Sequence, residues 1–188
     1  MTINVVITGA NRGIGLELSR HYASQGDQVI AVCRDTSDEI ENLADLVISG
    51  IDLSHDEAMD TVLQVLKMAH SDDFKIDILI NNAGVFQNET LEAMDYEQIR
   101  QQFEVNTLAP LKVTHALLPH LKSGSKVANV TSRMGSIEDN TSGAYYGYRA
   151  SKAALNAFGK SLAIDLKPKG ISVALLHPGF VQTRMVGF

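Results

Sequence analysis

Short apolar runs alternate with longer amphipathic stretches along almost the whole chain. The apolar runs are rich in β-branched residues and predict strands over residues 3–8, 28–33, 46–51, 76–80, 126–131 and 171–176. The stretches between them place apolar residues at helical spacing and predict helices over residues 13–25, 37–44, 55–69, 95–121 and 148–166. Strands and helices that alternate in this way are typical of a parallel sheet whose crossover connections are helices.

The predicted strands are apolar almost without interruption, rather than at every second position. Strands with this pattern are buried on both faces, so helices must cover both sides of the sheet. The pattern therefore predicts an α/β fold of the Rossmann type, a doubly wound parallel sheet in a three-layer αβα arrangement with strand order 3-2-1-4-5-6. The sequence has no internal repeat, low-complexity tract or linker, so we expect a single domain over residues 1–188.

Composition and charge narrow the class of protein. Hydrophobic residues make up 45% of the 188 residues and charged residues 20%, which is an ordinary balance for a globular domain. The net charge of -6 argues against a nucleic-acid-binding surface, which needs clustered basic residues. No apolar run approaches the roughly 20 residues that span a bilayer, and the N-terminus lacks the pattern of a secretory signal. The single cysteine, Cys33, allows no intramolecular disulfide, so we expect a cytoplasmic protein in which this thiol has a packing role.

A glycine-rich segment connects the first predicted strand to the first predicted helix. Gly9 permits a tight turn, Gly13 lets the backbone approach a pyrophosphate, and Gly15 allows the helix to pack closely. Exposed N–H groups at the start of the helix would then bind the phosphates. The glycines alone could form an ordinary connection, but their position between a strand and a helix near the N-terminus favours dinucleotide binding.

The end of the second predicted strand indicates which dinucleotide binds. A carboxylate at this place would bond the ribose hydroxyls of NAD and would repel a 2′-phosphate. This sequence instead has Arg34 after Cys33, and the glycine-rich segment adds Arg12. Guanidinium groups suit a phosphate by charge and by geometry. Both could also be solvated surface charges, and Asp35 weakens the case slightly, yet the pattern favours NADP(H) over NAD(H).

Tyr148 and Lys152 lie four residues apart near the start of the last predicted helix, so they share one helix face. A phenol has a pKa of about 10, and a cation held close lowers that pKa toward the range in which tyrosine acts as a general acid. Neighbouring tyrosines differ in this respect, because Tyr145 has Arg149 four residues later and Tyr146 has an alanine. Taken alone, such a pair also occurs on solvated helix faces.

Further polar residues follow the ends of later strands, where ligands bind in open α/β sheets. Asp52 could accept a bond from an adenine amino group, or it could be an N-terminal acid of the next helix. Asn106 is disfavoured inside a helix, so it marks either a local kink or a functional amide. The other polar and small residues expected at this edge are Asn81, Asn82, Ala83 and Gly84, then Thr131 and Ser132, and then the loop of residues 177–183.

Taken together, these motifs resemble the classical short-chain dehydrogenase/reductase family. The matches run in the family's order over essentially the whole chain. Within the family, residues 11–13, 33–35 and 132–137 look like the C-factor and Sniffer-type carbonyl reductases. The matching residues are Thr8, Gly9, Gly13 and Gly15, then Asn81 to Gly84, Asn106, Ser132, Tyr148 and Lys152, and finally Pro178, Gly179 and Thr183.

The resemblance implies an NADPH-dependent reductase that converts a small or hydrophobic ketone or aldehyde into an alcohol, with no metal. Tyr148 would protonate the substrate oxygen, Lys152 would lower the tyrosine pKa and bond the nicotinamide ribose, and Ser132 would polarise the carbonyl. Asn106 would hold a water that links Lys152 to solvent. The implied cofactor contacts are Gly9, Asn11, Arg12, Gly13, Ile14 and Gly15 at the phosphates, Arg34 at the 2′-phosphate, Asp52 and Leu53 at the adenine, Asn82 at the adjacent ribose, and Pro178, Val181 and Thr183 near the carboxamide.

The chain departs from the family pattern in two places. Ser132 and Tyr148 are 16 positions apart, a little wider than is usual in the family; a loop over residues 137–147 can absorb the difference, and Ser136 is a weaker alternative for the serine role. The chain also stops at Phe188, where full-length relatives continue with lid helices and a seventh strand. We therefore expect a substrate site without its cover, whether the chain is a natural short form, a fragment or a frameshifted product, or a partner supplies the missing part.

The resemblance also bears on partners. Family dimers often pair two long helices, here residues 95–121 and 148–166, so we expect a homodimer, a small-molecule substrate, and neither nucleic-acid nor membrane binding. The alternative function is a nucleotide-binding signalling or interaction protein of the C-factor type with little turnover. A complete set of Tyr148, Lys152, Ser132 and Asn106 favours the enzyme.

Overall fold

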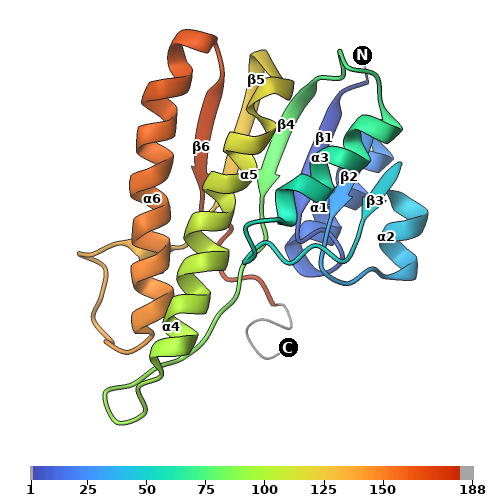
Figure 1. Ribbon diagram of the computed structural model, residues 1–188. Coiled ribbons are helices and arrows are strands. Elements are labelled where there is room, and N and C mark those ends of the chain that lie inside the picture. Colours follow the sequence, from blue (N-terminus) through green and yellow to red (C-terminus); the bar gives the residue numbers. More distant parts are fainter. Residues whose placement is uncertain (1, 183–188) are drawn as a thin grey trace.

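The computed structural model describes residues 2–182, and within them six strands form one parallel sheet (Figure 1). The order of the strands is β3-β2-β1-β4-β5-β6, which confirms the predicted doubly wound topology. Because the strands are parallel, their carboxyl ends meet at one edge of the sheet, the lower edge in Figure 1. The strands are β1 (Asn4–Thr8), β2 (Gln28–Val32), β3 (Leu46–Ile48), β4 (Ile76–Asn81), β5 (Leu121–Val130) and β6 (Ser172–Leu176).

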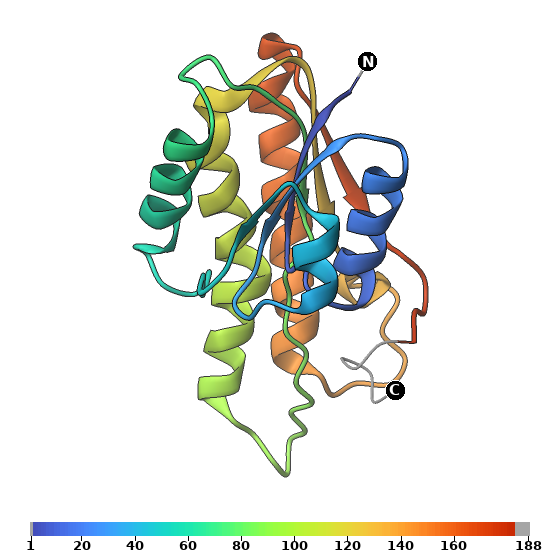
Figure 2. The same ribbon diagram turned by 90° about the vertical axis from the view of Figure 1, so that its right-hand side faces the viewer.

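Helices cover both faces of the sheet, as Figure 2 shows. The blue helices near the N-terminus lie on one face, and the green, yellow and orange helices lie on the other. The first face carries α1 (Gly13–Ser24) and α2 (Asp38–Leu43), and the second carries α3 (Ala58–Ala69), α4 (Tyr96–Phe103), α5 (Ala109–Leu117) and α6 (Tyr146–Leu166). None of the helices in residues 2–182 is long and apolar enough to span a membrane.

Alternate residues of the central strands enter two separate hydrophobic clusters. Val6 and Ile30 pack toward α3 and α5, where they meet Leu66 and Val113. The neighbouring residues of β1 and β2 pack toward α1 and α2 instead, and these are Val5, Ile7, Val29 and Ala31. Both faces of each strand are therefore buried, which explains why the strand sequences are apolar at every position.

The helix predicted over residues 95–121 is interrupted. Between α4 and α5, residues Glu104–Leu108 form a π-helical segment that contains Asn106. Pro110 follows four residues after Asn106 and has no N–H, so the α-helical hydrogen bond to the Asn106 carbonyl cannot form. The chain accommodates this missing bond with a widened turn, a feature often found at functional sites.

Several other predicted boundaries move by a few residues. α3 begins at Ala58 rather than at residue 55, and α6 begins at Tyr146 rather than at 148. β5 begins at Leu121, where the predicted helix was still running, because a short 3₁₀ turn at Leu118–His120 ends the helix first. The register between β4 and β5 then shifts near Ile76, so the first residues of β5 do not pair regularly. These differences lie at the amino end of the sheet or at helix starts. At the carboxyl edge, β3 was predicted to reach residue 51 but ends at Ile48.

Candidate active site

Tyr148 and Lys152 occupy the first turns of α6 and face the carboxyl edge of the sheet. The Lys152 ammonium lies 5.8 Å from the centre of the Tyr148 ring. Its Nζ atom donates a hydrogen bond of 2.9 Å to the carbonyl oxygen of Val130, at the end of β5. Lys152 is only 4% exposed, and the strand end therefore fixes its ammonium beside the phenol.

Burial dominates the pKa values of both groups. It lowers the pKa of Lys152 from the ordinary value of 10.5 to about 8. It raises the pKa of Tyr148, while a hydrogen bond with the Ser132 side chain acts in the lowering direction. The sequence predicted a lowered pKa for this tyrosine, and that prediction is wrong for this structure. The ammonium bonds the Val130 carbonyl, whereas the phenol loses its hydration, and desolvation disfavours the ionised form.

Ser132 reaches the same place from the end of β5. It precedes a single 3₁₀ turn, Arg133–Gly135, and its Oγ atom accepts a hydrogen bond of 3.1 Å from the Met134 N–H. Gly135 allows this turn to pack directly on α6, because a Cβ atom there would lie 2.8 Å from the backbone carbon of Lys152. The alternative serine, Ser136, is exposed and accepts a bond from the Asp139 N–H instead. The geometry therefore favours Ser132 for the serine role.

Asn106 projects from the π-helical segment into a buried position beside the site. Its amide nitrogen donates to the Val85 carbonyl at 2.9 Å and to Ser151 Oγ at 3.0 Å, and its oxygen accepts from the Val85 N–H at 2.8 Å. A Cβ atom on Gly84 would lie 3.2 Å from the Asn106 oxygen and 3.8 Å from Lys152 Nζ. The structure confirms the predicted kink at Asn106, and a functional role for its amide stays a prediction.

The glycine-rich segment forms a cradle between β1 and α1. Gly9 and Gly13 have φ values of +66° and +54°, which glycine adopts without strain. A Cβ atom on Gly15 would lie 2.2 Å from the Gly9 carbonyl oxygen, so only glycine fits there. The Asn82 amide braces this turn by donating to the carbonyls of Thr8 and Gly9, at 3.0 and 3.1 Å.

The start of α1 suits an anion. Arg12 occupies the N-cap position, and no side chain caps the helix. The first N–H groups of a helix lack partners within the helix, and the helix dipole favours negative charge at this end. The cradle therefore fits the pyrophosphate of a dinucleotide, which the strand–glycine–helix pattern predicted.

Arg34 and Asp52 follow the ends of β2 and β3 and lie near each other. The Asp52 carboxylate accepts bonds from the Ser54 hydroxyl at 2.7 Å and the Ser54 N–H at 3.0 Å. Those bonds hold the pKa of Asp52 below its usual range, and the charge of Arg34 acts in the same direction. Arg34 itself is exposed and contacts Asp35 at 3.4 Å. Asp52 therefore closes its own turn with Ser54 and is not an N-terminal acid of α3, which begins only at Ala58 with Glu57 as its N-cap.

The loop after β6 meets the glycine-rich segment from the other side. A cavity of about 380 Å³ lies between them and is lined by Pro178, Val181 and Gln182 together with Gly13 and Ile14. Four of these residues were predicted to contact the cofactor. Thr183, predicted to contact its carboxamide, lies outside the described residues.

Sequence reasoning missed an aromatic group beside Tyr148. The ring of Phe86 packs edge-on against Tyr148 with centroids 4.8 Å apart, and it stacks on Tyr145 at 5.4 Å. Phe86 lies in the loop after β4, where no periodic pattern marks a residue as functional. Its position two residues after Gly84, in a segment that enters the site, is the signal that would have identified it.

Residues 2–182 contain no group of three or more His, Cys, Asp or Glu side chains placed to hold a metal ion. The side chains at the site carry hydroxyl, amide, ammonium and guanidinium groups, and Asp52 adds one carboxylate. The residues predicted from the sequence gather at the carboxyl edge of the sheet, with Tyr148, Ser132, Lys152 and Asn106 on one side and the glycine cradle on the other.

Comparison with known proteins gives a consistent picture. The family profile described as short chain dehydrogenase matches residues 3–188. The chain is 40% identical over 181 residues to the 1-hydroxy-2-glutathionyl-2-methyl-3-butene dehydrogenase of Rhodococcus sp. (strain AD45), covering 96% of this chain and 79% of the relative. It is 51% identical over 115 residues to the C-signal protein of Myxococcus xanthus, covering 60% of this chain and 69% of that protein.

Solved structures are similar over the whole chain. The NADPH-bound carbonyl reductase from chicken fatty liver has a TM-score of 0.86 and 28% identity, with 100% of this chain and 84% of that chain covered. The carbonyl reductase Sniffer of D. melanogaster has a TM-score of 0.86 and 31% identity, with the same coverage of 100% and 84%. The predicted resemblance to C-factor and Sniffer-type proteins is confirmed by these matches.

Proposed function

This chain belongs to the short-chain dehydrogenase family, and from that premise we propose that it reduces a ketone or an aldehyde to an alcohol with NADPH. As a member of the family it is an oxidoreductase that uses a nicotinamide cofactor. The observation that carries the proposal is the convergence of Tyr148, Ser132 and Lys152 at one point on the carboxyl edge of the sheet.

The chemistry of these side chains suits carbonyl reduction. The bound cofactor supplies a hydride, and negative charge then develops on the carbonyl oxygen of the substrate. Hydroxyl groups of Tyr148 and Ser132, which are close enough to hydrogen-bond each other, would donate to that oxygen. The raised pKa of Tyr148 keeps the phenol protonated, so it enters the reaction as an acid with a proton to give.

Lys152 and Asn106 would support this proton transfer. The ammonium of Lys152 is within reach of the phenol ring and of the Val130 carbonyl, where it would also bond a nicotinamide ribose. Its lowered pKa makes it readier to release a proton than an exposed lysine. Asn106 fixes Val85 and Gly84 beside Lys152, and its oxygen has a second lone pair at which a water could be held for proton resupply.

The cofactor contacts follow from the cradle and its surroundings. Gly9, Asn11, Arg12 and Ile14 would line the phosphates, and Asp52 and Leu53 would face the adenine. Asn82 would contact the adjacent ribose, and Pro178, Val181 and Thr183 the carboxamide. Arg34 lies near Asp52, and its guanidinium is exposed. Arg34 and Arg12 would therefore supply two cations to bind a 2′-phosphate. The NADPH bound to the chicken carbonyl reductase supports this preference.

A second candidate function rests on a different observation. The relative with the higher identity over its matched part is named C-signal, and it matches 60% of this chain. A nucleotide-binding interaction protein that retains the reductase residues but turns over little would fit that similarity. The convergence of Tyr148, Ser132 and Lys152 favours the enzyme, because a pure binding role leaves it unexplained.

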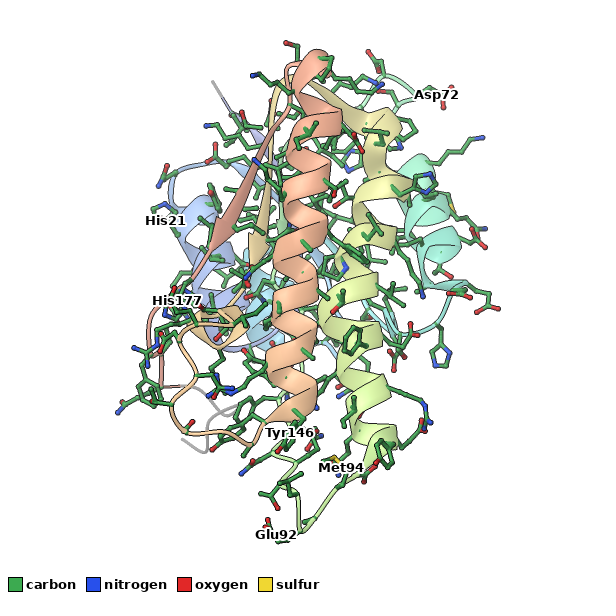
Figure 3. All side chains as sticks on the ribbon, turned by 90° about the vertical axis from the view of Figure 1, so that its left-hand side faces the viewer. His21, Asp72, Glu92, Met94, Tyr146 and His177 are labelled. Carbon is green, nitrogen blue, oxygen red and sulfur yellow. The ribbon has the colours of Figure 1, made fainter. Side chains whose placement is uncertain are left out.

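The proposed assembly is a cytoplasmic homodimer. α4 and α6 lie side by side on the outside of the molecule, and Tyr96, Tyr146 and Ile164 are exposed on them (Figure 3). Pairing of these two helices with those of a second copy would cover those side chains. Light scattering is expected to give the mass of a dimer, and a tetramer would count against this pairing.

Cofactor titration followed by a turnover assay tests the proposed function. NADPH and NADH are titrated separately by cofactor fluorescence, and a panel of aliphatic and aromatic ketones and aldehydes is then supplied with the tighter cofactor. The proposal predicts tighter NADPH binding and reduction of at least one carbonyl. Tight binding without any reduction would favour the interaction role, and binding of neither cofactor would refute both candidates.

A further inference from the structure

Glu89 is a buried acid that the proposed chemistry does not use. Its side chain is 1% exposed and lies in the loop between β4 and α4, which passes beside the first turn of α6 (Figure 3). A buried carboxylate is unfavourable unless its oxygens accept hydrogen bonds. The partners of Glu89 therefore indicate what the residue is for.

Both carboxylate oxygens of Glu89 accept hydrogen bonds. The Gly147 N–H, in the first turn of α6, donates to Oε2 at 3.0 Å. The side-chain amide of Gln102, which is fully buried on α4, donates to Oε1. The main-chain carbonyl of Glu89 accepts a third bond, of 2.9 Å, from the Tyr145 N–H. One residue thus joins α4 to the segment that begins α6.

The direction of these bonds requires an acceptor at position 89. The oxygen of Gln102 is already occupied by the Gln87 N–H at 3.0 Å, so its NH₂ group must face Glu89. A main-chain N–H can only donate, so turning the Gln102 amide around would set two donors against each other. The Gly147 N–H also only donates. A carboxylate satisfies both of these donors, whereas a glutamine at position 89 could accept from one of them alone.

The segment held by Glu89 is strained. Ala144 and Tyr145 have φ values of 52° and 55°, in the left-handed region that residues other than glycine rarely adopt. α6 begins at the next residue, and Tyr145 as its N-cap makes no side-chain capping bond. The first turn of α6 also packs tightly against α4, because a Cβ atom on Gly147 would lie 2.4 Å from the Gln102 amide nitrogen. Tyr148 follows directly, so its place depends on this turn.

We propose that Glu89, held by Gln102, is a positioning residue that fixes the strained start of α6 and thereby the phenol of Tyr148. Glu89 touches no reacting atom in this account and acts through the N–H groups of Tyr145 and Gly147. The inference rests on the proposed function for its effect on turnover. Its effect on the backbone does not, and the two can be measured separately.

The test exchanges the acid and the amide between the two positions. Glu89→Gln leaves the Gln102 amide or the Gly147 N–H without an acceptor, and we expect kcat for carbonyl reduction to fall by about 10- to 100-fold. The NADPH Kd should change by less than about threefold, because the cradle is built from other elements. Glu89→Gln combined with Gln102→Glu gives the Gly147 N–H, the Gln87 N–H and the residue-89 amide an acceptor each. It loses the longer bond of 3.3 Å from the Gln102 amide to the Gln98 carbonyl, within α4, and should recover kcat to within about fivefold of wild type.

Hydrogen exchange of the peptide around Gly147 gives a readout that does not depend on activity. The Gly147 amide is expected to be protected in wild type, to exchange faster in Glu89→Gln, and to regain protection in the double variant. Asp77→Asn is the matched control, because that carboxylate accepts a 2.9 Å bond from the Asn4 N–H at the opposite end of the sheet. It should leave both kcat and exchange at Gly147 unchanged.

The outcomes distinguish the positioning role of Glu89 from the proposed carbonyl reduction. Recovery of protection and turnover in the double variant supports the proposal, even if Glu89→Gln alone fails to fold. A double variant as impaired as Glu89→Gln overturns it, as does a Glu89→Gln protein with wild-type kcat and wild-type exchange. If the wild-type protein reduces no carbonyl but the exchange pattern follows the swap, the proposed function fails while the positioning role stands.

Discussion

The ammonium of Lys152 lies 5.8 Å from the centre of the Tyr148 ring and is almost entirely withdrawn from water. Burial shifts the pKa of each group more than the neighbouring group does. The lysine becomes easier to deprotonate and the tyrosine harder. The pair therefore consists of a protonated phenol next to a cation that can pass its proton on, which suits an acid that must be reloaded after each reduction.

The buried lysine predicts a pH dependence of stability. Its pKa falls from 10.5 to about 8 on folding, so between these values the unfolded chain holds a proton that the folded chain has lost. The free energy of unfolding should therefore rise with pH across that window, by up to about 3 kcal/mol for this one group. Lys152→Met should remove the rise, and Lys160→Met, on an exposed position of the same helix, should keep it. Denaturant unfolding from pH 8 to 10.5 measures this, and parallel curves for wild type and Lys152→Met would contradict it.

Gly135→Ala tests the contact that holds Ser132 in place. The added methyl group would lie 2.8 to 3.0 Å from backbone atoms of Lys152 and Ala153, so the 3₁₀ turn must move away from α6. We expect a loss of about 1–3 kcal/mol in stability and a fall in kcat of about tenfold or more. Gly26→Ala is the control, since a Cβ there meets nothing within 4 Å but its φ of +77° still strains the backbone. If both variants lost stability and neither lost kcat, the packing of this turn would have no bearing on catalysis.

Alanine substitutions of Ser132 and Ser136 should have clearly different effects on kcat. Ser132 shares a hydrogen bond with Tyr148, whereas Ser136 is exposed and bonds the Asp139 N–H. Ser132→Ala should lower kcat by about 10²-fold, because one donor to the developing oxyanion is lost. Ser136→Ala should keep wild-type kcat. Steady-state assays with one carbonyl substrate decide this, and the reverse ranking would move the serine role to Ser136.

Arg34 should determine the choice of cofactor. Its guanidinium is exposed beside Asp52 and pairs only weakly with Asp35, so it remains available to a phosphate. Arg34→Ala should raise the Kd for NADPH by about tenfold, as expected for the loss of a charge-assisted bond, and should leave the Kd for NADH nearly unchanged. Fluorescence titration of both cofactors measures the ratio of the NADPH Kd to the NADH Kd. Equal weakening of NADPH and NADH would show that Arg34 supports the site without reading the 2′-phosphate.

The sheet could be predicted because its signal lies in consecutive residues. Val5 and Val6 are both apolar because they face opposite clusters, and that pattern alone indicates a sheet covered on both sides. The interruption of the helix could be predicted in part, because Asn106 is disfavoured inside a helix and Pro110 follows it by four positions. A prediction that combined the two residues would have located the π-helical segment.

The parts that sequence reasoning missed depend on contacts between distant segments. The raised pKa of Tyr148 comes from burial, to which the packing of Phe86 from another loop contributes, and spacing within one helix contains no information about that loop. Glu89 and Gln102 each look like ordinary polar residues in the chain. Only the fold shows that one accepts the hydrogen bonds that the other donates.

Carbonyl-dependent oxidation of NADPH by wild type and by Tyr148→Phe tests the role of Tyr148 as the acid. Wild type should oxidise NADPH in the presence of a ketone or aldehyde. The variant, which keeps the aromatic packing and loses only the acidic hydroxyl, should be slower by about 10² to 10⁴-fold with nearly unchanged NADPH affinity. Wild-type turnover in Tyr148→Phe would show that another group supplies the proton and that Tyr148 is not the acid.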